Sequence, residues 1–124
     1  MAVTLTPREL EIMTILWDLG SGTVNEVRDR MEDALAYTTI LSFLRTMHEK
    51  GYVRHVTEGR AHRFIPRIRQ EAVHRTAVSR LVETVFGGSS ELALTQLVSD
   101  RRLSNAELRR IRQLIDERLP AGDR

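Results

Sequence analysis

The sequence predicts a mainly α-helical fold with one small β-hairpin, an α+β class. Apolar residues recur at helical spacing through most of the 124 residues, whereas residues 52–65 alternate around a Gly-containing turn. At three expected helix starts a Ser or Thr is followed three residues later by Glu, the capping-box pattern. The length suits a small domain with an appended helical unit, and we place these at residues 1–68 and 69–124.

The first two helices are expected to begin just after Thr6 and Thr23, which open the first two capping boxes. The first helix carries a wide apolar stripe that includes Met13 and Trp17, and the glycines within residues 20–22 end it. The second helix is shorter. Its N-terminal amides and dipole favour an anion, so Thr23 is a candidate neighbour of a phosphate.

Residues 37–50 predict a third helix with two different faces. Ile40, Leu44 and Met47 form one apolar stripe. The candidate contact residues on the remaining surface are Thr38, Thr39, Ser42, Arg45 and Thr46. Short hydroxylated or cationic side chains of this kind can approach base edges and phosphates, although a polar helix face is most often only solvated. Thr38 can equally be interpreted as a helix cap.

Residues 52–57 and 60–65 predict the two strands of a hairpin, with Gly59 in the turn and Pro66 ending the second strand. A tight pair of helices followed by a hairpin is typical of a helix-turn-helix with a wing, in which residues 37–50 are the recognition helix. Residues 54–69 are rich in Arg and contain a single acid. Arg54 and Arg60 are therefore candidate phosphate contacts, with Arg60 at the tip.

From residue 69 onward the pattern is helical again and predicts three helices. Such helices bury little by themselves, so their apolar stripes are expected to pack against a second copy in a symmetric dimer. The alternative is a monomer in which they fold back onto the winged domain. The candidate dimer contacts are Val73, Ala77, Leu81, Val82, Val85, Leu97, Leu108, Ile111 and Ile115.

Composition argues against several classes of protein. The net charge is only +2, cysteine is absent, and no apolar run has the length of a membrane span or the form of a signal peptide, so we expect a cytoplasmic protein without membrane insertion. The four histidines lack metal-site spacing to Asp or Glu, and no nucleophile or phosphate-cradling motif occurs. We therefore expect neither an enzyme nor a bound cofactor or metal.

The chain resembles the penicillinase-repressor family, which includes the BlaI and MecI repressors. The motifs that carry the resemblance keep the family's order and spacing: Leu5-Thr6, Glu11-Ile12-Met13, Leu16-Trp17, Thr23-Val24, Glu26-Val27, Tyr37-Thr38-Thr39, Glu49-Lys50-Gly51 and Glu58-Gly59-Arg60-Ala61 with Arg63, Phe64 and Pro66. The resemblance implies a dimeric winged-helix repressor that binds a two-fold symmetric DNA operator and blocks a promoter. Leu41 and Thr46 stand where members are often basic, so the preferred operator can differ.

In the β-lactam-responsive branch of that family, a membrane sensor protease cuts the repressor in its dimerisation region. The resemblance places the equivalent bond near Gln96-Leu97, which is not the Asn-Phe pair of the cut members. A sensor protease is thus a partner implied only by the resemblance. One alternative from another class stays open at this point, a winged helix that uses the polar face of residues 37–50 to bind a protein.

Overall fold

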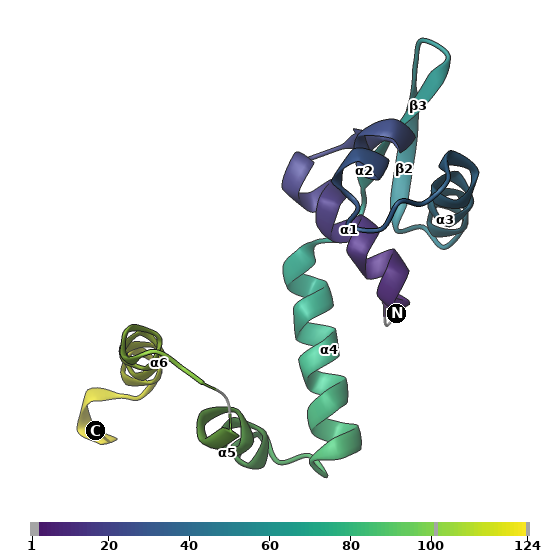
Figure 1. Cartoon of the computed structure of the whole chain (residues 1–124). Coiled ribbons are helices and arrows are strands. Elements are labelled where there is room, and N and C mark those ends of the chain that lie inside the picture. The colour runs from purple at the N-terminus through teal and green to yellow at the C-terminus, as the bar shows by residue number, and fades with distance from the viewer. Residues whose placement is uncertain (1–2, 101, 124) are drawn as a thin grey trace. The chain divides into compact units, whose positions relative to one another are not determined.

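The computed structural model describes residues 3–100 and 102–123 and forms two compact units, residues 1–79 and 80–124. The mainly helical fold with a small sheet is confirmed. Because the division falls within the fourth helix, the first turns of that helix belong to the N-terminal unit, and a separate domain at residues 69–124 stays a prediction. The elements in order are α1 (Pro7–Leu19), β1 (Gly22–Thr23), α2 (Val24–Arg30), α3 (Tyr37–Glu49), β2 (Val53–Glu58), β3 (Ala61–Pro66), α4 (Gln70–Val85), α5 (Ser90–Asp100), α6 (Asn105–Arg118) and the 3-10 helix η1 (Ala121–Asp123) (Figure 1).

All three predicted capping boxes are present. At α1 the Glu9 N–H donates to the Thr6 hydroxyl at 3.2 Å, and the Thr6 N–H donates to the Glu9 carboxylate at 2.9 Å. The boxes at residues 23–26 and 104–107 start α2 and α6 in the same way. These reciprocal bonds satisfy backbone donors that a helix start leaves free, which is why the local sequence fixes these three positions.

The core of the N-terminal unit lies between α1, α2, α3 and the sheet. The apolar stripe predicted for α3 is confirmed, since Ile40, Leu44 and Met47 are fully buried. Trp17 is half-buried, and its indole N–H donates to the Ile68 carbonyl at 2.9 Å, which ties α1 to the segment before α4. The buried cluster consists of Ile12, Met13, Leu16, Val24, Val27, Met31, Ile40, Leu44, Met47, Val53 and Phe64.

The sheet has a third strand that the sequence did not predict. The two-residue strand β1 pairs antiparallel with β3, so the strand order is β1-β3-β2. Gly22 permits β1 to lie close against α1 and α2, because a Cβ at that position would lie 3.2 Å from the Leu16 Cδ2 and 3.4 Å from the Val27 Cγ2. The middle of β3 is therefore paired with the connection between α1 and α2.

The predicted wing is confirmed and projects beyond the helices of the N-terminal unit (Figure 1). Glu58 pairs with Ala61, which leaves Gly59 and Arg60 as a two-residue turn. Gly59 has a φ of 63°, a left-handed conformation that two-residue hairpin turns require and that glycine adopts without a steric penalty. The turn places the exposed side chain of Arg60 at the tip of the wing.

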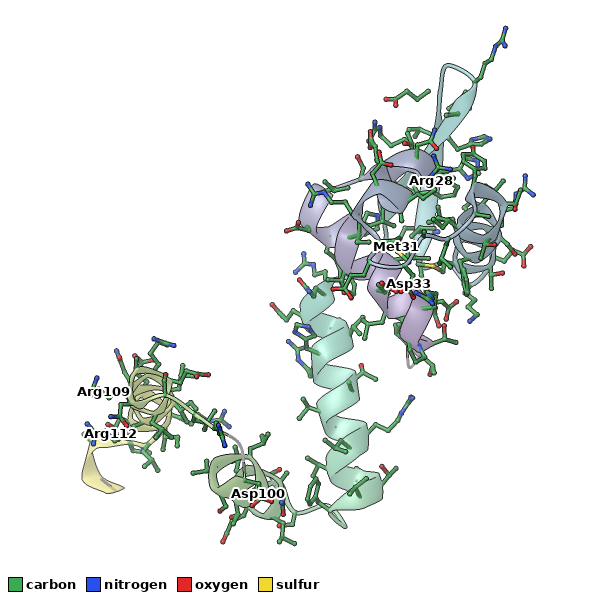
Figure 2. All side chains as sticks on the ribbon, viewed as in Figure 1. Arg28, Met31, Asp33, Asp100, Arg109 and Arg112 are labelled. Carbon is green, nitrogen blue, oxygen red and sulfur yellow. The ribbon has the colours of Figure 1, made fainter. Side chains whose placement is uncertain are left out.

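The helices of the C-terminal unit leave most of their large apolar side chains exposed. None of the described residues of α5 or α6 is buried, although Ser89 caps α5 by accepting a hydrogen bond from the Leu92 N–H at 3.1 Å. Arg109 and Arg112 lie together on one side of α6 (Figure 2). The large apolar residues exposed from residue 80 onward are Leu81, Val85, Leu92, Leu94, Leu97, Val98, Leu108, Leu114, Ile115 and Leu119.

One candidate dimer contact behaves differently from the rest. Val73 is only 8% exposed and lies in the N-terminal unit, so it packs within its own chain and we leave it out of the proposed interface. Val82 and Ile111 are half-buried, and the other candidates on α4 to α6 are exposed. Within residues 3–100 and 102–123, no helix combines the length and hydropathy that a membrane span needs.

Candidate nucleic-acid interface

The exposed side of α3 borders a hollow of about 540 Å³, and most of the residues that line it carry a hydroxyl group. Four of the predicted contact residues, Thr38, Thr39, Ser42 and Thr46, line it together. The alternative interpretation of Thr38 as a helix cap is wrong. The helix α3 begins at Tyr37 with Ala36 as the N-cap, and no side chain makes a capping hydrogen bond there. The Thr38 side chain therefore lies on the helix surface, where its hydroxyl can reach a ligand.

Arg45 lies apart from the other candidates, on the side of α3 that faces the wing. It lines a second, smaller hollow with His48 from the same helix and with His55 and His62 from the hairpin. The recognition helix thus has a hydroxylated side next to α1 and a basic side next to the wing. A rotation of about 100° separates neighbouring residues on a helix, which explains why Arg45 and Thr46 divide between the two sides.

The two predicted phosphate contacts of the wing occupy different positions. Arg60 is at the tip. Arg54 is also exposed, but neighbouring strand residues point to opposite faces, so it lies on the face of β2 opposite to His55. The face with His55 and Phe64 is the one next to α3. Arg54 therefore points away from the recognition helix, and contact with the same DNA segment stays a prediction.

Arg63 belongs to the basic stretch in the sequence, yet in the structure it is paired with acids on two elements. Its guanidinium donates to Glu26 of α2 at 2.8 and 3.0 Å and to Glu58 of β2 at 3.0 and 2.9 Å. These bonds raise the pKa of Arg63 and lower the pKa of each carboxyl. Arg63 thus links the wing to α2, and the wing is less basic than the sequence suggests.

Thr23 is largely engaged in its own capping box. Its hydroxyl accepts from the Glu26 N–H at 3.2 Å, and its own N–H donates to the Glu26 carboxylate at 3.3 Å. The carboxylate also brings negative charge to the N-terminus of α2, where Arg63 balances it. A phosphate contact through Thr23 stays a prediction with less support than the sequence pattern gave it.

Sequence reasoning missed an ion pair between a buried carboxylate and a partly exposed lysine at the end of the recognition helix. The side chain of Glu9 is 2% exposed, and the Lys50 Nζ lies 3.0 and 3.2 Å from its two carboxylate oxygens. Burial raises the pKa of Glu9, but the hydrogen bond from the Thr6 backbone and the pairing with Lys50 outweigh it, so the pKa lies below its ordinary value. Glu9 shares the helical face of Ile12, Met13 and Leu16, a spacing from which its burial could have been found.

Comparisons with known proteins agree with this architecture. The penicillinase repressor family matches residues 5–117. The transcriptional regulator BlaI of Mycobacterium tuberculosis is 31% identical over 118 residues, which cover 92% of this chain and 83% of its own. The resemblance noted from the sequence motifs is thereby confirmed.

Two solved structures are similar to the winged part of the chain. The solution structure of the DNA-binding domain of the repressor BlaI has a TM-score of 0.52 and 27% identity, over 58% of this chain and 90% of its own. The monomeric form of Bacillus licheniformis BlaI in complex with the blaP half-operator has a TM-score of 0.50, with the same identity and coverage. This chain belongs to the penicillinase repressor family of winged-helix transcriptional regulators.

Proposed function

We propose that the chain is a dimeric, sequence-specific DNA-binding repressor of the cytoplasm that occupies a two-fold symmetric operator and so blocks a promoter. The observation that carries this proposal is the hydroxylated surface of α3 beside a projecting wing with Arg60 at its tip. A helix of this kind fits the major groove, where hydroxyls and methyl groups meet base edges. A relative at 27% identity was solved in complex with a half-operator, which supports DNA binding by the winged part of this chain.

The dimer part of the proposal rests on the exposed apolar residues of α4, α5 and α6. Large apolar side chains that share helical faces and stay exposed in one chain are suited to an interface with a second copy. A two-fold dimer would place two recognition helices about one helical turn of DNA apart. The Gln96-Leu97 bond lies inside α5, so a sensor protease would need local opening of that helix before it could cut there.

Selection from a library of random duplexes tests the proposal without knowledge of the operator. The full chain should enrich sequences with two inverted half-sites whose centres lie about 10 base pairs apart. A pool that stays unenriched after repeated rounds would contradict sequence-specific binding. If binding to any duplex were also insensitive to salt, the alternative of a protein-binding winged helix would be favoured, because counterion release would be missing.

Arg60→Ala should weaken binding to selected and random duplexes alike, because a contact at the wing tip with phosphate carries no sequence information. The slope of log affinity against log salt should become shallower by about 1. A salt series by fluorescence anisotropy measures this. Arg75→Ala is a matched control, since Arg75 pairs with Glu71 on α4 and its loss should leave the slope unchanged.

Ser42→Ala and Thr39→Ala should instead reduce discrimination between the selected duplex and a scrambled one. Both hydroxyls line the surface next to α1, and each lost hydrogen bond to a base edge should cost about 1 kcal/mol, or about fivefold. The ratio of the two dissociation constants is the measurement. Equal weakening on both duplexes would show that the hydroxyl contacts the backbone or merely supports the helix.

A further inference from the structure

Three histidines from separate elements meet between the recognition helix and the wing. The ring centroids of His48 on α3 and His55 on β2 lie 4.6 Å apart, and those of His55 and His62 on β3 lie 4.5 Å apart. Phe64 lies beside them, at 5.8 Å from His55 and 6.4 Å from His62. The sequence separates these residues by seven positions each, and only the fold brings His48 to the other two.

The cluster lines a hollow of about 170 Å³. All three imidazoles are exposed, so a ligand can reach their nitrogen atoms. The described residues contain no group of three side chains that could hold a metal ion, so the rings are not arranged as a metal site. The other residues that line the hollow are Leu41, Arg45, Glu49 and Phe64.

The surroundings of the hollow favour the neutral form of His55 in the absence of an anion. Desolvation by the neighbouring groups, followed by the positive fields of His62 and His48, lowers the pKa of His55 below its ordinary value. Two oppositely charged side chains, Arg45 and Glu49, also line the hollow, and both project from α3. An anion in the hollow would add negative charge beside the rings and raise the pKa of His55.

We propose that His48, His55 and His62 form a binding site for a DNA phosphodiester, and that occupation of this site takes up protons. The inference rests on the proposed function, which places α3 in the major groove; the projecting wing would then lie over the neighbouring minor groove. The sugar-phosphate strand that separates the two grooves must then cross the space between α3 and the wing, where the histidines lie. A protonated imidazole can donate two hydrogen bonds and carries the charge that a phosphate favours.

The sign of the pH effect follows from linkage. A group whose pKa is higher in the complex than in the free protein takes up a proton on binding, so affinity rises as the pH falls between those two values. Each proton taken up can strengthen binding by at most about tenfold per pH unit. We expect binding to tighten by about threefold to tenfold per unit between about pH 8 and pH 6. The slope should be the same on selected and random duplex, because phosphates are common to both.

The test is a series of anisotropy titrations of the full chain at constant ionic strength, on a selected duplex and on a scrambled one. His55→Gln/His62→Gln should flatten the pH slope, whereas a purely structural role of these rings would lower affinity equally at every pH. His74→Gln on α4 is the matched control and should keep the full slope, since His74 lies outside the cluster. NMR titration of the His55 ring in the unmodified chain should show a higher pKa with random duplex bound than without it.

Three results would overturn the inference. They are a flat pH slope in the unmodified chain, an equal slope in the double variant, and a His55 pKa that DNA does not raise. If one of these results occurred and the chain still preferred the selected duplex, the phosphate site would be rejected and the repressor proposal would stand. A chain that failed to prefer the selected duplex at any pH would contradict the repressor proposal instead, while the slope on random duplex would still decide the phosphate site.

Discussion

Leu81→Asp is expected to convert the proposed dimer into monomers and to weaken binding to a two-fold symmetric duplex by about 100-fold or more. Leu81 is 48% exposed in the single chain, and Val78 and Val85 share its side of α4. An aspartate there would place an unpaired charge in the apolar interface. Once the winged domains separate, each binds its half-site alone and the gain from linked binding disappears.

Sedimentation gives the mass of the species, and anisotropy on full and half operators gives the affinities. Ser79→Asp is the matched control, because it adds the same charge to α4 about 200° around the helix from Leu81. Binding to a half-site should persist in Leu81→Asp, which would show that the winged domain still folds. A dimer mass that Leu81→Asp leaves unchanged would show that this stripe is not the interface.

Lys50→Met should destabilise the chain by about 1 to 2 kcal/mol at neutral pH, because it leaves the buried carboxylate of Glu9 without its cation, while the 40% exposure of the Lys50 side chain lets solvent screen part of the effect. Lys50 is the C-cap residue of α3, and its pairing with α1 holds that end of the recognition helix. The free energy of unfolding from urea denaturation measures the loss. The double variant Glu9→Gln/Lys50→Met should recover much of it, since a neutral amide needs no counterion.

The loss of stability in Lys50→Met should depend on pH with a definite sign. In the unmodified chain the pKa of Glu9 lies below its ordinary value, so the pair contributes stability above the pKa of the unfolded state and loses it as the pH falls through the folded pKa. Without Lys50, burial should raise the pKa of Glu9. Protonation of the Glu9 carboxylate then removes the unpaired buried charge from the variant. The deficit of Lys50→Met should therefore shrink from pH 7 towards about pH 4. A deficit that stays constant over this range would argue against an electrostatic origin.

Features fixed by local chemistry could be predicted from the sequence. The capping boxes at Thr6, Thr23 and Ser104 depend on residues three positions apart, and the hairpin turn depends on Gly59. The recognition helix could be predicted from the sequence as well, because its buried and exposed sides follow from a single helical period.

The features that were missed depend on contacts between distant parts of the chain. Strand β1 is too short for an alternating pattern and exists only through its pairing with β3. In the sequence, Arg63 is indistinguishable from the other basic residues of the wing. In the structure its Nη1 lies 2.8 Å from the Oε1 of Glu26, a residue 37 positions earlier. The histidine cluster likewise requires His48 of α3 to meet the hairpin. Periodicity describes one element at a time and carries no information on which side chains of two elements meet.

The most direct test of the central claim is an anisotropy titration of the full chain on three duplexes at one salt concentration: a selected two-fold operator, one of its half-sites, and a scrambled sequence. The claim predicts that the operator binds at least about 1,000-fold more tightly than the scrambled duplex, with the half-site between them. Equal affinities for all three duplexes would contradict a dimeric repressor that reads DNA through α3.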